Sequence, residues 1–154
     1  MKKILVYYPP NNRSIAIETL CKAVHEAGNE VFFLTLTDKG AIHQVLESKG
    51  IKTFNHTLVR KNSWIYFLRH ARFLRKFCKE HKIEIVLSHL KECNIISVIA
   101  KPFLKARLIN FRHHAEIRFF YQFGNQLRLK RNKKEMLLDK IINRLSSKIV
   151  VPSG

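Results

Sequence analysis

The sequence is short of the residues that crosslink, interrupt or loosen a chain. Its 154 residues include only 3 cysteines, 5 glycines and 4 prolines, against 46% hydrophobic residues. The cysteines are odd in number, widely spaced and without a Cys-x-x-Cys pair, which argues against a disulfide framework and a zinc site, so we interpret Cys21, Cys78 and Cys93 as buried thiols. The low glycine and proline content excludes a low-complexity chain, and we expect one packed domain.

Long hydrophobic runs are also missing. No stretch approaches the roughly 18 consecutive apolar residues of a membrane-spanning helix, and the apolar run after Met1-Lys2-Lys3 stops at Pro9-Pro10, which is too short for a secretory signal. The chain is therefore expected to be cytoplasmic. The phosphate-binding patterns GxxxxGK[ST] and GxGxxG are missing too, which argues against a P-loop nucleoside triphosphatase and a dinucleotide-binding dehydrogenase.

Acidic residues are scarce. Lys and Arg number 29 against 11 Asp and Glu, which gives a formal charge of +18. The imbalance is strongest late in the chain, since Glu116, Glu135 and Asp139 are the only acidic residues of 101–154. Such a charge attracts polyanions of any kind, whether nucleic acid, an anionic bilayer or phosphorylated substrates, so the charge alone does not select a partner.

What the sequence does contain is a regular alternation of strand and helix signals. Lys3–Tyr8 (KILVYY) is a β-branched and aromatic run that suits a buried parallel strand, and the helical periodicity that follows ends at Gly28. Further strands are expected at 30–36, 51–54, 83–88, 107–111 and 148–151, and further helices at 41–49, 64–81, 91–101 and 137–145. We therefore predict an α/β protein, a Rossmann-like open parallel sheet of about six strands with helices on both faces. Residues 116–135 could form a helix, a loop or both.

Polar side chains follow several of the expected strands. Because ligands of open parallel sheets bind beyond the carboxyl ends of the strands, these residues are candidate ligand-binding residues. They are Asn11, Asn12, Arg13 and Ser14 after the first strand, His89 after the fourth, Arg112, His113, His114 and Glu116 after the fifth, and Ser153 after the sixth. A metal site is not expected, because adjacent histidines point in different directions and no His pair stands at i, i+4.

Two segments combine aromatic and basic residues. Residues 64–81 predict an amphipathic helix with an apolar stripe of Trp64, Phe67, Leu68, Ala71, Leu74 and Phe77, and with Arg69, Arg72, Lys76 and Lys79 outside it. Later, Phe119 and Phe120 precede Arg128, Lys130 and Arg131. This basic surface is either a solvated face over the core or a surface for an anionic membrane or another polyanion.

Several motifs in order resemble the amino-terminal domain of glycosyltransferase family 4, whose members are retaining enzymes of the GT-B fold. They are KILVYYPP at the start, HEAGNE before VFFLTL, KGIKTF, IEIVLSH, RLINFRHHAE, and LLDKIINRLSSKIVVPSG at the end. The resemblance implies that residues 1–154 form one acceptor-side domain, half of a GT-B fold, and that the donor-binding domain is absent from this chain. Alone, the chain is then expected to be inactive.

The resemblance also assigns roles. It implies a hexosyltransferase-like enzyme that moves a sugar from a nucleotide-sugar donor to a glycan, a lipid carrier or an envelope acceptor, works at the inner membrane face and needs no metal cofactor. His113 or His114 matches the family's histidine beside the transferred sugar, His89 matches the end of its fourth strand element, and Arg112 would neutralise a phosphate. The family's glycine-rich first loop is Asn11-Asn12-Arg13-Ser14 here.

Two other functions compete with this one. A basic nucleic-acid-binding module would use the charge, but no zinc-finger spacing, RNP-like strand or helix-turn-helix supports it, so a nucleic-acid partner is disfavoured. A non-catalytic adaptor of the same fold would keep only an acceptor or lipid surface.

Overall fold

In the computed structural model, the chain folds into one parallel sheet covered on both faces and a separate hairpin. The structure describes residues 1–59, 62–111, 120–123, 126–131 and 133–150. The strands are β1 (Lys3–Tyr8), β2 (Glu30–Thr35), β3 (Lys52–Asn55), β4 (Ile85–His89), β5 (Arg107–Phe111), β6 (Phe120–Phe123), β7 (Gln126–Arg131) and β8 (Lys148–Val150). The helices are α1 (Ile15–Glu26), α2 (Ala41–Glu47), α3 (Ser63–Glu80), α4 (Leu90–Ala100) and α5 (Lys133–Leu145), with a 3-10 turn, η1, at Lys101–Phe103.

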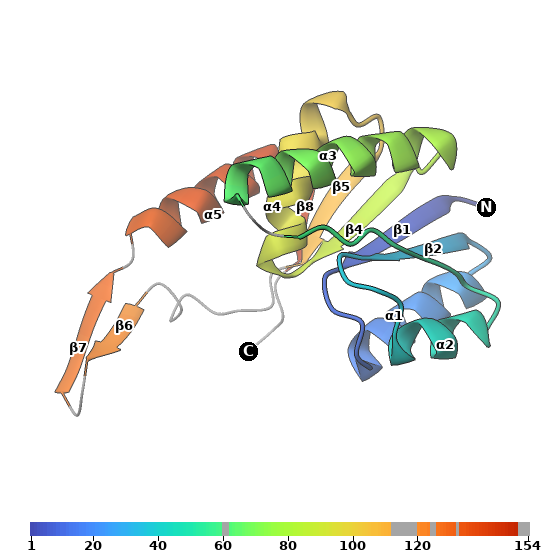
Figure 1. Cartoon of the computed structure of the whole chain (residues 1–154), viewed down its shortest axis with the longest axis horizontal. Helices are drawn as coiled ribbons and strands as arrows, with labels where there is room; N and C mark the ends of the chain where they lie inside the picture. The colour runs from blue at the N-terminus through green and yellow to red at the C-terminus, as the bar shows by residue number, and fades with distance from the viewer. Residues whose placement is uncertain (60–61, 112–119, 124–125, 132, 151–154) are drawn as a thin grey trace.

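The sheet confirms the predicted fold class. Six parallel strands stand in the order β3-β2-β1-β4-β5-β8, and the helices cover both faces: α1 and α2 on one, α3, α4 and α5 on the other (Figure 1). The chain builds outward from β1 to β3 and then returns to the other side of β1 at β4. This is the order of a Rossmann-like sheet, with its point of reversal between β1 and β4.

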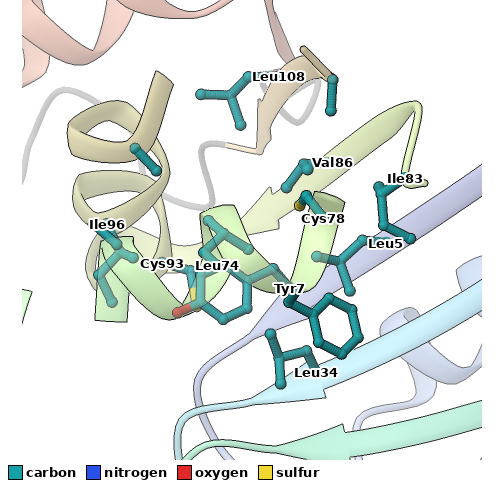
Figure 2. Packing of buried hydrophobic residues seen from close by; sticks show 14 of the residues in the cluster. Leu5, Tyr7, Leu34, Leu74, Cys78, Ile83, Val86, Cys93, Ile96 and Leu108 are labelled. Atoms are coloured by element: carbon teal, nitrogen blue, oxygen red, sulfur yellow. The ribbon is translucent and has the colours of Figure 1, made fainter. Parts of the chain in front are cut away.

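Strand alternation divides the core into two clusters. Leu5 and Tyr7 of β1 pack toward α3 and α4 with Leu74 and Ile96, as Figure 2 shows, whereas Ile4 and Val6 belong to the cluster under α1 and α2. Successive strand side chains point to opposite faces, so one apolar strand serves both cores. The three cysteines are free and buried, as predicted, and burial raises the pKa of Cys21 and Cys78 to about 12.

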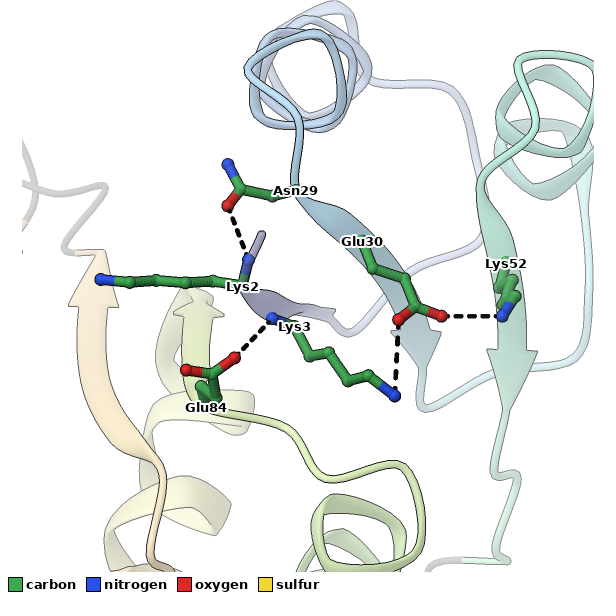
Figure 3. A network of polar contacts seen from close by, with 6 residues as sticks. All are labelled: Lys2, Lys3, Asn29, Glu30, Lys52 and Glu84. Atoms are coloured by element: carbon green, nitrogen blue, oxygen red, sulfur yellow. Dashed lines mark hydrogen bonds and ion pairs between the residues drawn. The ribbon is translucent and has the colours of Figure 1, made fainter.

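Polar contacts join four strands at the amino edge of the sheet (Figure 3). Glu30 of β2 pairs with Lys3 of β1 at 3.4 Å and with Lys52 of β3 at 2.8 Å. The Lys3 amide donates to the Glu84 carboxylate, next to β4, at 3.1 Å, and the Lys2 amide donates to Asn29. These contacts hold together the amino ends of β3, β2 and β1 and the residue before β4.

Two details of the prediction were wrong. Residues 120–123 and 126–131 form an antiparallel hairpin, β6 and β7, rather than a helix or loop, and α5 begins at Lys133 instead of Leu137. In 126–131 (QLRLKR) leucines alternate with basic residues at the period of a strand, a signal that the strong charge obscures. The two segments are separated by Gly124-Asn125, a dipeptide typical of hairpins.

The apolar stripe of α3 was also partly wrong. Its buried side consists of Tyr66, His70, Ala71, Leu74, Phe77 and Cys78. Trp64 is 75% exposed and Leu68 is 47% exposed, since both lie beside this stripe rather than in it. The helix therefore has a second, exposed apolar area near its amino terminus.

Candidate functional site

The carboxyl ends of β1 and β4 meet where the order of the sheet reverses. The loop after β1 holds Asn11, Asn12, Arg13 and Ser14, and β4 ends at His89. In an open α/β sheet this point of reversal is the place where ligands bind. The structure therefore brings the first predicted group of residues and His89 to one edge, as the sequence pattern indicated.

Asn11 fixes the shape of this loop against the neighbouring one. Its side chain donates to the Asp38 carbonyl at 2.8 Å, and its own carbonyl accepts the Ile42 amide at 3.3 Å. Gly40 lies so close that a Cβ there would stand 2.7 Å from the Asn11 carbonyl oxygen, so only glycine fits. Asn11 thus has a structural role in addition to its predicted binding role, while Asn12 is exposed.

Arg13 is held by an acidic partner. Its Nε and Nη2 donate to the two oxygens of Glu18 at 3.0 and 2.8 Å, and this contact with Arg13 is the main cause that lowers the pKa of Glu18. A guanidinium has five N–H groups, so the fork leaves donors for a second anion. Ser14 is the N-cap residue of α1, with extended backbone and no side-chain capping bond, so its hydroxyl is not used in capping.

His89 is enclosed by aromatic rings. Only 2% of its surface is exposed, its ring stacks on Phe111 with centroids 4.2 Å apart, and Tyr8 meets it edge-on at 6.5 Å. His89 is also the N-cap residue of α4. A buried, stacked imidazole has a fixed orientation, so at most one edge of the ring can meet a ligand.

The residue after His89 has an unusual backbone. Leu90 has a φ of 63°, in the left-handed region that non-glycine residues avoid. Such strain persists where the surroundings hold it, and it is common at functional sites. Asn94, one turn later, donates to the Phe111 carbonyl at 3.1 Å and thereby ties the end of β5 to α4. Sequence reasoning missed Leu90, Asn94 and Tyr8.

Two more histidines, His43 and His56, lie at the edge of the sheet formed by the carboxyl ends of the strands, here called the carboxyl edge. His43 is buried, and its ring nitrogens contact Thr35 Oγ1 at 3.0 Å and the Gly40 amide at 3.0 Å. His56, directly after β3, has its Nδ1 3.0 Å from Nδ1 of buried His70 and stacks on Phe73. Burial lowers the pKa of His43 and His56, and lowers that of His70 to about 4. Through these contacts the imidazoles join the segments after β2 and β3 to α2 and α3.

The remaining predicted residues divide into three groups. Arg69, Arg72, Lys76 and Lys79 are exposed on α3. Phe120, Arg128, Lys130 and Arg131 lie in β6 and β7, for which the structure describes the backbone. Arg112, His113, His114, Glu116, Phe119 and Ser153 lie outside the described residues.

The described part of the chain holds neither a candidate metal cluster nor a membrane-spanning helix. There, no three His, Cys, Asp or Glu side chains come together in a way that could hold a metal ion. No helix within the same residues is long and apolar enough to cross a bilayer.

Comparison with known proteins gives a family and a fold. The model of Glycosyltransferase Family 4 matches residues 14–154. None of the curated proteins compared with the chain matches it significantly.

Solved structures share the fold at low sequence identity. A glycosyltransferase from Rickettsia africae is 17% identical with a TM-score of 0.69, and the match covers 97% of this chain and 36% of that one. Anabaena HepE, solved with UDP and glucose, is 14% identical with a TM-score of 0.67, covering 97% and 37%. MurG of Acinetobacter baumannii is 12% identical with a TM-score of 0.67, covering 100% and 42%. The chain thus spans about two fifths of the length of these proteins.

Proposed function

The chain belongs to glycosyltransferase family 4, and from this premise we propose that it is the acceptor-side domain of a retaining glycosyltransferase. The complete enzyme transfers a sugar from a nucleotide-sugar donor to a glycan, a lipid carrier or another envelope acceptor. In this proposal, the chain supplies one wall of the cleft and a second α/β domain supplies the donor site. The size of the solved relatives supports this division, because the chain corresponds to 36–42% of their length.

The observation that carries the proposal is the position of the Asn11–Ser14 loop and His89 at the reversal between β1 and β4. The loop precedes α1, whose first amide groups have no partners within the helix and favour an anion. Arg13 adds a guanidinium whose direction Glu18 fixes. These donors suit the hydroxyl and phosphate groups of an acceptor.

Roles at the reacting sugar follow from the family resemblance. One of His113 and His114 would lie beside the transferred sugar, and Arg112 and Glu116 would contact donor or acceptor groups. We propose electrostatic stabilisation by these side chains without a metal cofactor. Replacing His113 and His114 singly by Gln in the two-domain enzyme distinguishes them: the cleft residue loses kcat, whereas its neighbour keeps it.

Ligand titrations monitored by amide NMR test the acceptor role. A polyprenyl phosphate in detergent micelles, an oligosaccharide and UDP-glucose are added separately to the labelled chain, with empty micelles as a blank. We expect one of the two acceptor probes to shift the amides of 11–14 and Leu90 saturably, and UDP-glucose to leave them unchanged. His89→Gln should weaken the response and exposed His25→Gln should not. Saturable binding of UDP-glucose at these amides would instead assign the chain to the donor side.

We also propose that the domain works at an anionic membrane surface. The exposed apolar area near the start of α3 consists of Trp64, Ile65 and Leu68, with exposed fractions of 75, 55 and 47%. Arg69 and Arg72 lie on the same helix and are exposed. An indole and two aliphatic side chains beside guanidinium groups match the interface of an anionic bilayer.

A further inference from the structure

A pocket opens at the amino edge of β4 and β5, on the opposite edge of the sheet from His89. Its volume is about 510 Å³, and its lining comes from the end of α3, the residues before β4, η1 and the residues before β5. The lining residues are Arg75, Cys78, Lys79, Lys82, Ile83, Phe103, Leu104, Lys105 and Ala106. The proposed transfer reaction does not use this region.

The rim of the pocket is cationic. Arg75, Lys79, Lys82 and Lys105 are all exposed, and the described residues that line the pocket include no acidic one. The acidic residues nearest in sequence are engaged elsewhere, since Glu80 pairs with Lys76 at 3.6 Å and Glu84 accepts the Lys3 amide at 3.1 Å. Among the ion pairs of the described residues, none involves the four rim cations. Four like charges therefore surround one opening.

The helix end does not account for these cations. At the end of α3, the Lys82 amide donates to the Lys79 carbonyl at 3.3 Å and the Ile83 amide donates to the Cys78 carbonyl at 2.9 Å. These two bonds form a Schellman motif, which satisfies the Cys78 and Lys79 carbonyls without side chains. The remaining partial negative charge of the helix terminus is only about half an elementary charge.

The floor of the pocket is apolar. Cys78, Ile83 and Ala106 are 6%, 6% and 3% exposed, and their inner sides belong to the core, where Cys78 and Ile83 are seen in Figure 2. Burial raises the pKa of Cys78 to about 12, so the thiol is neutral. Phe103 adds an exposed ring, and the Arg75 guanidinium lies 4.9 Å from its centroid. A ligand that is part anionic and part apolar fits both zones.

The walls are held in place by hydrogen bonds. The Leu104 amide donates to the Lys101 carbonyl at 3.1 Å, Lys101 Nζ donates to the Ala106 carbonyl at 3.3 Å, and the Arg107 amide donates to the Glu84 carbonyl at 2.8 Å. Ordering of the loop before binding removes part of the entropic cost of binding. The pocket is therefore preformed.

We propose that this pocket binds an organic phosphate, with the phosphate held by the rim cations and the apolar part of the ligand against the floor. Charge-assisted bonds to phosphate are stronger than neutral ones, and flexible lysines accept a phosphate in several orientations. The ligand is either a soluble phosphate ester or the headgroup of an anionic lipid, which share this chemistry. The pocket is separate from the proposed acceptor site at the other edge of the sheet.

Titration with phenyl phosphate and with inorganic phosphate tests the proposal on the 154-residue chain, with amide NMR as the readout. We expect phenyl phosphate to shift the amides of 82–83 and 104–106 and to bind more tightly than inorganic phosphate. The triple variant Lys79→Gln, Lys82→Gln, Lys105→Gln should bind phenyl phosphate about tenfold more weakly. A matched variant with exposed Lys2, Lys49 and Lys140 changed to Gln has the same net charge and should bind as the original does.

A second variant isolates the apolar contact. Phe103 is 65% exposed, so Phe103→Ala should fold normally, weaken phenyl phosphate binding several-fold and leave inorganic phosphate binding unchanged. Equal loss of affinity in the two lysine variants, or shifts outside the pocket, would overturn the proposal. Sedimentation with phosphatidic acid vesicles then identifies the source: less pelleting of the Lys79, Lys82, Lys105 variant than of the matched variant assigns a lipid headgroup, and equal pelleting assigns a soluble ester.

Discussion

Burial separates the histidines of this chain into chemically different groups. His70 is fully buried beside His56, and burial, with further contributions from the charges of His56 and Arg69, lowers its pKa to about 4. His25, in contrast, is exposed on α1. A histidine whose pKa is lower in the folded chain than in the unfolded chain makes the stability of the fold depend on pH.

Acidification should therefore destabilise the fold. The unfolded chain protonates His70 near pH 6.5, and the folded chain does so only near pH 4, so its contribution is complete above pH 6.5 and is lost as the pH falls toward 4. Within this window the slope is roughly 1.4 kcal/mol per pH unit for one proton. Urea unfolding at a series of pH values measures the slope. His70→Gln should reduce it by about one proton, and His25→Gln is the control for replacing an exposed histidine; an unchanged slope in His70→Gln would contradict the assignment.

The sequence could predict the place of His89 but not the roles of His43 and His70. His89 follows a strongly apolar strand, and the end of such a strand defines a ligand edge. The signal for His70 was its position in the helical series Tyr66, His70, Leu74 and Phe77, which is the buried side of α3. That series competes with the more apolar one through Trp64 and Leu68, and only packing against the sheet decides between them.

The ends of α1, α2 and α3 share a left-handed backbone conformation, but only two of the three have the glycine that this conformation favours. Gly28 and Gly50 end α1 and α2 with φ values of 80° and 76°, as their positions after the helical periodicities predicted. Lys82 occupies the same left-handed position after α3, with a φ of 55°. A side chain there costs about 1 kcal/mol relative to glycine.

Lys82→Gly should therefore stabilise the chain by about 1 kcal/mol, because the backbone conformation is kept and the strain is removed. Thermal unfolding should shift upward by about 3 °C for a domain of this size. Arg72→Gly, in the exposed interior of the same helix, is the matched control and should lose about 1 kcal/mol. Destabilisation by both substitutions would show that the Lys82 side chain contributes more than its backbone conformation costs.

Elements with strong apolar periodicity were predictable, and those defined by partners were not. The six strands of the sheet could be predicted because each is a short apolar run, rich in β-branched residues, between two helical segments. Such runs are typical of parallel strands that are buried on both faces. Among the described strands, β6 and β7 pair only with each other. Their sequences, FYQF and QLRLKR, do carry strand signals, but the strong positive charge of the segment obscures them. The sequence also placed the Asn11–Ser14 loop after β1, but the bond from Asn11 to the Asp38 carbonyl and the close contact with Gly40 depend on a neighbouring loop.

At the scale of the whole molecule, the positive charge of +18 is unevenly distributed: some cations are paired with acids, and others gather on one helix. At the amino edge, Lys3 and Lys52 share Glu30, whereas the exposed cations of α3 extend from Arg69 to Lys79 beside an apolar end. α3 has 18 residues and spans about 27 Å, so its apolar end and the phosphate pocket are separate surfaces. A membrane that meets the apolar end would leave the carboxyl edge of the sheet to a lipid-linked acceptor.

Vesicle sedimentation tests the membrane surface. The chain should pellet with vesicles that contain phosphatidylserine and much less with neutral phosphatidylcholine, and salt should reduce pelleting because the attraction between charges is screened. Trp64→Ser should weaken binding to the anionic vesicles by about tenfold through loss of the buried indole. Ile15→Ser is the matched control, because Ile15 is 81% exposed on α1, which covers the other face of the sheet. Equal pelleting with both lipids, or equal effects of the two substitutions, would exclude this orientation and leave α3 as a solvated face over the core.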